Sequence, residues 1–292
     1  MSNDLEILSS PDVPNGLPPP KPPGRIPNFG HTVLFFTVAV IVLLLTSVSV
    51  FALAMGLHLL GTEPPEQLLR EPRLLIPTMA GAYLIAGTIV WAIFTYLWQQ
   101  PFTRALHWNF GAVQRRWAGL LAGGVLLSVV VQFLSNFLPI PKTLPIDDFF
   151  RTPADVWMVA LFGTFVAPIF EELAFRGFLL PSMASTWDWL RGQQRGLLDG
   201  ARMDEDPRWS IQALVISCTV TSIAFALVHA DQLAHAWAPL AVLFGVSLVL
   251  CGVRLWTQSL AASTFIHATY NGTIFTILFF ATGGFRHLDK IK

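Results

Sequence analysis

The sequence predicts an all-α protein, a polytopic bundle of about seven to eight transmembrane helices around a polar cavity inside the membrane. The first observation is composition: 53 % of the 292 residues are hydrophobic and only 12 % are charged. A soluble globular domain carries about 25 % charged residues. The second observation is that the apolar residues form long runs. The third is that the few ionisable groups inside these runs occur in the C-terminal half of the chain.

The apolar runs are long enough to predict the membrane spans one by one. Crossing a hydrocarbon core of about 30 Å takes about 20 mostly apolar residues in a helix. The runs that qualify are 32–59, 74–98, 117–140, 156–180, 211–230, 237–254 and 259–282. They predict seven spans, and an eighth can be hidden between them. The longest polar connection, 183–209, is expected to lie on the membrane surface as an amphipathic stretch.

The chain is predicted to contain one folded domain. Residues 1–30 are polar and include eight prolines, so we expect a disordered tail there. Residues 31–285 form a single transmembrane domain, in which 156–281 carry the motifs described below, and 286–292 are a short basic tail. We expect a multi-pass integral membrane protein surrounded by membrane lipids, located in the plasma (inner) membrane of a prokaryote.

Charge and cysteine content argue against two other classes of protein. The formal net charge is zero, so no basic surface indicates binding to nucleic acid. The two cysteines, Cys218 and Cys251, both lie in apolar runs. They are predicted to be small buried residues rather than a disulfide framework or a metal-binding pair.

Ionisable side chains inside the predicted spans mark the candidate site, because such groups are costly in a bilayer and usually functional. The fourth run contains Glu171, Glu172 and Arg176. Glu172 and Arg176 are four residues apart on one helix face, in the favourable order for an ion pair. Glu171 is rotated by about 100° from Glu172, so it cannot comfortably share the same arginine. One carboxylate is predicted to be paired and structural, the other available as a general base.

Two further runs supply imidazoles and an amide. The fifth run ends with His229, and the seventh contains His267 and Asn271, which are four residues apart and share one helix face. Imidazole and carboxamide groups can donate hydrogen bonds to a developing oxyanion. The spacing therefore predicts that Glu171, His229, His267 and Asn271 converge from three helices as parts for activating water.

Each pattern also has a structural interpretation. The glutamate–arginine segment can simply lock two helices together, a lone histidine near a helix end can be interfacial, and a His–Asn pair can hold helices together by hydrogen bonds. A non-catalytic membrane protein, such as a transporter or immunity factor, can use the same polar cluster for binding. A transporter of this kind normally shows inverted repeats, and the N-terminal half has no second segment like the glutamate–arginine one.

The predicted depths of the polar groups disagree with one another. At 1.5 Å per residue, Glu171 and His267 lie near one membrane face, whereas His229, at the end of its run, lies near the other. Either the fifth helix starts later than predicted, or the segment 229–236 is non-helical backbone folded into a cavity. Such backbone is tolerated where protein shields it from lipid.

These motifs resemble those of the CAAX prenyl protease and bacteriocin-processing (CPBP, or Abi) family. Its Glu-Glu-x-x-x-Arg motif is matched by Glu171, Glu172 and Arg176. Its Phe-x-x-x-His motif is matched by Phe225 and His229, and its His-x-x-x-Asn/Asp motif by His267 and Asn271. The resemblance covers about residues 156–281.

The resemblance implies an intramembrane endopeptidase with CAAX-type or peptide-processing substrates. Glu171 and His229 would activate water, and His267 and Asn271 would form the oxyanion hole. Glu172, Arg176 and Phe225 would support the site. The implied partner is a membrane-associated or lipidated peptide or protein.

No cofactor is expected, although zinc is the alternative. Catalytic zinc sites commonly combine three protein ligands with a water. Glu171, His229 and His267 are the candidate zinc ligands, whereas the pairing of Glu172 with Arg176 removes a fourth. The metal-free mechanism is therefore the one predicted.

Overall fold

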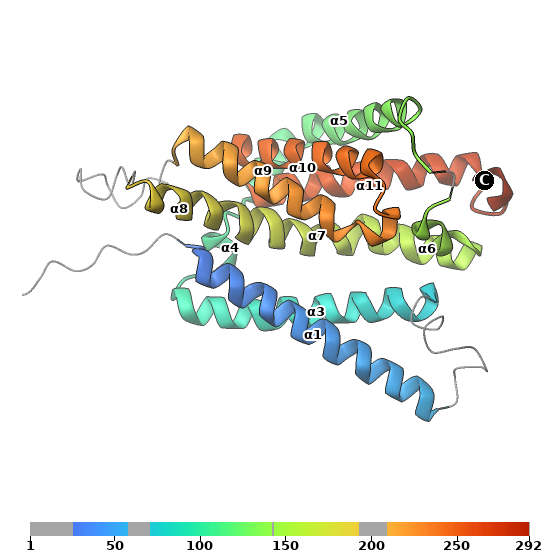
Figure 1. Ribbon diagram of the computed structural model, residues 1–292, viewed down its shortest axis with the longest axis horizontal. Coiled ribbons are helices and arrows are strands. Elements are labelled where there is room, and N and C mark those ends of the chain that lie inside the picture. The colour runs from blue at the N-terminus through green and yellow to red at the C-terminus, as the bar shows by residue number, and fades with distance from the viewer. Residues whose placement is uncertain (1–25, 58–70, 142, 193–208, 292) are drawn as a thin grey trace, which may run out of the picture.

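The computed structural model describes residues 26–57, 71–141, 143–192 and 209–291, and every regular element in these ranges is a helix (Figure 1). The all-α prediction is confirmed. Most of the predicted N-terminal tail lies outside the described residues, and α1 already begins at Phe29. Both cysteines are free thiols; Cys251 is buried and Cys218 partly so.

Six of the elements are single helices of 18 to 28 residues. They are α1 (Phe29–Gly56), α3 (Pro72–Trp98), α5 (Phe110–Ser135), α9 (Ile211–Val228), α10 (Trp237–Thr257) and α11 (Leu260–Ala281). A short helix, α4 (Phe102–Ala105), links α3 to α5. Three 3₁₀ turns complete the connections: η1 (Pro145–Phe150), η4 (Asp231–Leu233) and η5 (Leu288–Ile291).

A continuous helix runs from Pro153 to Leu190, and we refer to it as the central helix. Its successive parts are α6 (Pro153–Leu161), η2 (Phe162–Val166), α7 (Ala167–Glu172), η3 (Leu173–Leu179) and α8 (Leu180–Leu190). Of the predicted surface stretch at 183–209, residues 183–190 continue this helix. Residues 193–208 lie outside the described part of the chain.

Six described helices are long and apolar enough to cross a membrane: α1, α3, α5, the central helix, α9 and α10. They overlap the first six predicted runs, although α5 begins seven residues earlier and the central helix ends ten residues later than predicted. The seventh run forms α11, which has 22 residues but carries polar groups along its length and is not among the six. Large apolar side chains cover the outside of the bundle. On α1, for example, Leu44, Leu45 and Val48 are exposed. An exterior of this kind suits a lipid solvent.

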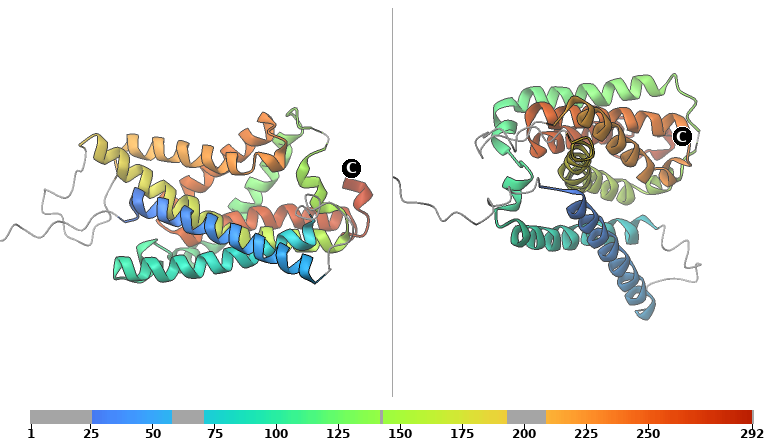
Figure 2. Two further views of the ribbon diagram at one scale, coloured as in Figure 1. Left: turned by 60° about the horizontal axis from the view of Figure 1, so that its bottom comes forward. Right: turned by 60° about the vertical axis from the view of Figure 1, so that its left-hand side comes forward.

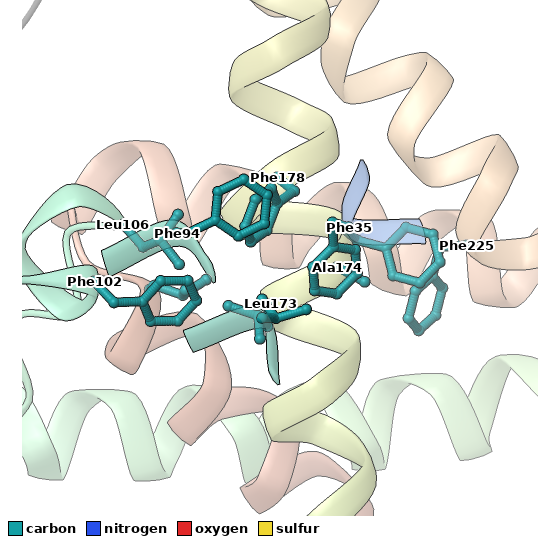
Figure 3. Close-up of a cluster of buried hydrophobic side chains, with 11 residues drawn as sticks. Phe35, Phe94, Phe102, Leu106, Leu173, Ala174, Phe178 and Phe225 are labelled. Atoms are coloured by element: carbon teal, nitrogen blue, oxygen red, sulfur yellow. The ribbon is translucent and has the colours of Figure 1, made fainter. Parts of the chain in front are cut away.

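The helices form two groups with the central helix between them (Figures 1 and 2). The antiparallel pair α1 and α3 packs on one side, while α5, α9, α10 and α11 pack on the other. An aromatic cluster joins the first pair to the central helix (Figure 3). Within it, Phe178 stacks on Phe35 with ring centroids 4.5 Å apart and contacts Phe94 at 4.9 Å. This cluster fixes α3 beside the acidic residues of the central helix.

Candidate active site

The acidic pair sits on a regular segment between two π-helical turns. Glu171 and Glu172 end α7, which is flanked by η2 and η3. Each π turn ends two residues before a proline, Pro168 or Pro181. Proline has no N–H for the carbonyl four residues earlier, and its ring clashes with that carbonyl. A wider turn accommodates both defects, and such turns occur often at functional sites.

Glu172 is fully buried and holds two partners on one oxygen. Arg176, also fully buried, donates from Nη1 to Glu172 Oε1 at 2.8 Å. The nitrogen Nδ1 of His267 lies 3.0 Å from the same oxygen. The ion pair predicted from the four-residue spacing is therefore present. The contact with His267 was not predicted, since it joins helices 95 residues apart in the chain.

Arg176 ties the central helix to its neighbours. Its Nη2 donates to the hydroxyl of Ser247 at 2.7 Å and to the Ser247 carbonyl at 3.1 Å. Its guanidinium carbon lies 4.8 Å from the ring centroid of Phe225, which is a cation–π distance. The arginine thus connects α10 and α9 to the carboxylate of Glu172. No sequence pattern indicates Ser247, because α10 has no other feature of the site.

Glu171 points between two imidazoles. Its Oε1 lies 4.0 Å from Nε2 of His229, and its Oε2 lies 3.7 Å from Nε2 of His267. These separations are too long for direct hydrogen bonds. The side chain is 18 % exposed, unlike that of fully buried Glu172. The carboxylate that was predicted to be unpaired is thus the accessible one.

The backbone sets the orientation of His229. Its Nδ1 lies 2.8 Å from the carbonyl oxygen of Phe225, one helical turn earlier on α9. A carbonyl oxygen can only accept, so Nδ1 carries the hydrogen. In the neutral ring Nε2 then keeps its lone pair, and Nε2 is the atom that faces Glu171. Phe225 therefore supports the site through its backbone as well as its ring.

The orientation of His267 is likewise set by the partner of its Nδ1, which is Glu172. Its side chain is 4 % exposed, and its Nδ1 must donate to the carboxylate of Glu172. Its Nε2 therefore faces Glu171. Phe225 packs against both imidazoles, with ring centroids 4.9 Å from His229 and 5.9 Å from His267.

Asn271 is placed one turn beyond His267 on α11. Its Nδ2 donates to the carbonyl oxygen of Gly163 at 2.7 Å. Gly163 belongs to η2, so this bond joins α11 to the π turn that precedes the acidic pair. Glu171, His229 and His267 are thus brought together within 4.0 Å, whereas the described contact of Asn271 is with the central helix.

The predicted difference in membrane depth between Glu171 and His229 is resolved by the length of the central helix. Glu171 lies midway along its 38 residues rather than near one end of a shorter span. The fifth helix begins at Ile211, as predicted, and His229 is its C-cap. The chain then turns through η4 and two left-handed residues, Ala234 and His235, before α10 begins. Of the two explanations considered, non-helical backbone after His229 is the one present.

The candidate zinc ligands Glu171, His229 and His267 are not arranged as a metal-binding cluster. Within the described ranges, no group of three or more His, Cys, Asp or Glu side chains is arranged to hold a metal ion. One oxygen of Glu172 is engaged by both Arg176 and His267.

A comparison with protein families identifies the segment that carries these residues. Residues 153–273 match the family model described as Type II CAAX prenyl endopeptidase Rce1-like. The match confirms the resemblance predicted from the three motifs, and it contains every residue of those motifs. No curated protein and no solved structure matched the chain.

Proposed function

We propose, from the Rce1-like CAAX prenyl endopeptidase domain that residues 153–273 form, that this integral membrane protein is a glutamic intramembrane endopeptidase. The family supports a CAAX-type endopeptidase in general, and the proposal concerns how peptide hydrolysis is carried out. One observation carries it: the Glu171 carboxylate lies between the Nε2 atoms of His229 and His267, at 4.0 and 3.7 Å.

These separations suit a water molecule bound between the groups. Two hydrogen bonds of about 2.8 Å that meet near a right angle join atoms about 4 Å apart. A water held by Glu171 Oε1 and His229 Nε2 donates to both acceptors. As its oxygen bonds to the peptide carbonyl carbon, one proton passes to this pair. The pair then returns the proton to the leaving amine as the C–N bond breaks.

His267 is suited to the opposite task. Its Nδ1 lies 3.0 Å from Oε1 of Glu172, and this contact orients the ring with Nε2 toward Glu171. When Nε2 is also protonated, it donates to the carbonyl oxygen as that oxygen becomes negative. Asn271 has a second amide hydrogen besides the one bonded to Gly163 and joins His267 in this role.

The proposed mechanism uses no metal. Zinc would need at least three donors at about 2.0–2.2 Å from one point. The candidates are Glu171, His229 and His267, because Glu172 already neutralises Arg176 in a fully buried ion pair. Separate tasks for the two histidines follow from their different Nδ1 partners, a backbone carbonyl for His229 and a carboxylate for His267.

The test is hydrolysis by purified protein in detergent or proteoliposomes. The substrates are a peptide with a prenylated cysteine three residues before its C-terminus, its unprenylated form and a library of apolar peptides, with products identified by mass spectrometry. Wild-type protein is expected to cleave the prenylated peptide, and Glu171→Gln to leave it intact. Glu71→Gln is the matched control, because Glu71 is the N-cap of α3, without a side-chain capping bond. Wild-type protein that cleaves none of these peptides, or an active Glu171→Gln variant, would contradict the proposal.

A further inference from the structure

A serine on α10 shares the guanidinium group of Arg176 with Glu172. Ser247 is fully buried. Nη2 of Arg176 donates to the Ser247 hydroxyl at 2.7 Å and to the Ser247 carbonyl oxygen at 3.1 Å. Nη1 of Arg176 donates to Glu172 Oε1 at 2.8 Å. The two terminal nitrogens of one planar group are therefore held by two different helices, α10 and the central helix.

The buried ion pair uses only one oxygen of the carboxylate. Arginine and carboxylate groups frequently pair through two parallel hydrogen bonds. Here Oε2 of Glu172 and Nε of Arg176 are buried and make no hydrogen bond within the described residues. A second hydrogen bond from Arg176 to Oε2 would satisfy this oxygen. The contacts with Ser247 oppose it, because the rigid guanidinium cannot turn toward Oε2 without moving Nη2 away from Ser247.

The pairing through a single oxygen leaves the Glu172 carboxylate oriented toward His267. Nδ1 of His267 lies 3.0 Å from Oε1, and Nε2 of the same ring faces Glu171 at 3.7 Å. A two-oxygen pair with Arg176 would turn the carboxylate and take Oε1 out of line with His267. Direct contacts thus run from Ser247 through Arg176 and Glu172 to His267.

We propose that Ser247 is a positioning residue, whose hydroxyl holds Arg176 in single-oxygen contact with Glu172 and thereby keeps Nε2 of His267 directed at the reacting groups. The inference rests on the proposed function, in which His267 donates to the scissile carbonyl oxygen. Ser247 acts only through Arg176 and Glu172 and does not touch the substrate. Because the hydrogen bond from His267 strengthens in the transition state, a misdirected ring lowers kcat rather than raising KM.

The experiment measures kcat and KM of Ser247 variants in the peptide hydrolysis assay, on the folded fraction isolated by size exclusion. Ser247→Ala removes the hydroxyl acceptor of a charged hydrogen bond, so we expect kcat to fall about tenfold while KM changes less than about twofold. Ser247→Cys keeps a similar side-chain shape but offers only a weak acceptor, so its kcat should lie between those of Ser247→Ala and wild type.

Ser217→Ala is the matched control. Ser217 is also fully buried, but its hydroxyl donates to the Leu214 carbonyl oxygen of its own helix, α9. Removing this hydroxyl takes away a buried polar group without touching Arg176. We expect its kcat and KM to match those of wild type.

A double-mutant cycle tests whether Ser247 acts through His267. His267→Ala removes one proposed oxyanion donor, which costs about 10²–10³-fold in rate, and its residual rate is measured over long incubation. Adding Ser247→Ala to this variant is expected to cause no further loss, because the imidazole that Ser247 orients is gone. An equal loss in both backgrounds would overturn the inference, since Ser247 would then act independently of His267.

The outcomes separate this inference from the proposed function. Inactive wild-type protein contradicts the proposed function itself. Active wild type with an unchanged kcat in Ser247→Ala, or with a raised KM alone, overturns the role of Ser247 only. A Ser247→Cys enzyme slower than Ser247→Ala overturns it too, because rate would then not follow the strength of the acceptor. A graded loss of kcat that disappears in the His267→Ala background supports it.

Discussion

His267 and Glu172 form a buried hydrogen bond of 3.0 Å between Nδ1 and Oε1. The same oxygen accepts from Arg176 at 2.8 Å, so this carboxylate both neutralises a buried cation and orients an imidazole. Its role is therefore wider than that of a structural ion pair. A change at Glu172 is expected to affect the fold through Arg176 and the chemistry through His267.

The first prediction concerns this carboxylate. Glu172→Gln leaves Arg176 buried without an anionic partner, and breaking a buried pair in this way costs about 3–5 kcal/mol. We expect poor expression and a markedly lower thermal midpoint in detergent. Glu171→Gln is the control; its side chain is partly exposed and makes no direct hydrogen bond, so it should leave a folded, inactive protein. A stable Glu172→Gln protein beside an unstable Glu171→Gln protein would reverse the two assignments.

The second prediction concerns Asn271. Asn271→Ala removes one proposed oxyanion donor, which typically costs about 10²–10³-fold in kcat. It also removes the bond to the Gly163 carbonyl. We expect a slow but measurable enzyme, detected by product formation over long incubation. Thr273→Ala is the control, because its hydroxyl bonds only within α11, to the Thr269 carbonyl. Activity as low as that of Glu171→Gln would show that Asn271 does more than donate to the oxyanion.

The third prediction tests the contact between α5 and α11, the helix that carries His267. A Cβ atom added at Gly124 would lie 2.6 Å from Cβ of Thr269 and 3.0 Å from the Ile266 carbonyl. Gly124→Ala must therefore push the two helices apart, and overpacking costs about 1–3 kcal/mol. We expect a lower thermal midpoint and lower activity. At Gly119, on the same helix, an added Cβ meets nothing within 4 Å, so Gly119→Ala should leave both unchanged. Equal effects of the two substitutions would contradict this packing.

The fourth prediction concerns metal. In the metal-free mechanism His229 and His267 have separate tasks, so active protein should contain far less than one zinc per chain by elemental analysis. Activity should persist after treatment with a chelator. Under the zinc alternative, His229→Ala and His267→Ala would both abolish metal content along with activity. Stoichiometric zinc, with activity lost to chelator and restored by zinc alone, would overturn the metal-free proposal.

Sequence patterns located the polar residues because helical spacing records which side chains share a face. The pairing of Glu172 with Arg176 followed from a separation of four residues, and the structure contains it. The end of the central helix could not be predicted in this way. Beyond residue 180 the chain becomes polar, so hydropathy falls although the helix continues to Leu190. Asp188 in that last part is buried and accepts from the hydroxyl of Ser210, the N-cap of α9, a tertiary contact that composition cannot reveal.

Contacts between helices that are far apart in the chain could not be predicted from the sequence either. Ser247 and Tyr83 each carry a common side chain on an ordinary apolar helix, and no local spacing distinguishes them. Ser247 matters because Arg176 reaches it across 71 positions of the chain. Tyr83 stacks on Phe170 and so packs α3 against the central helix.

The two wide turns beside α7 make the site depend on residue number as well as residue type. A π turn closes its hydrogen bond over five residues rather than four, so deleting one residue from η2 or η3 would restore ordinary α geometry. Each residue of an α-helix advances by about 100°. A deletion in η2 would rotate Gly163 away from Asn271 while Glu171 still faced the histidines; a deletion in η3 would put α8 out of phase with α7. Single-residue gaps at these turns should therefore be tolerated as poorly as loss of the charged side chains themselves.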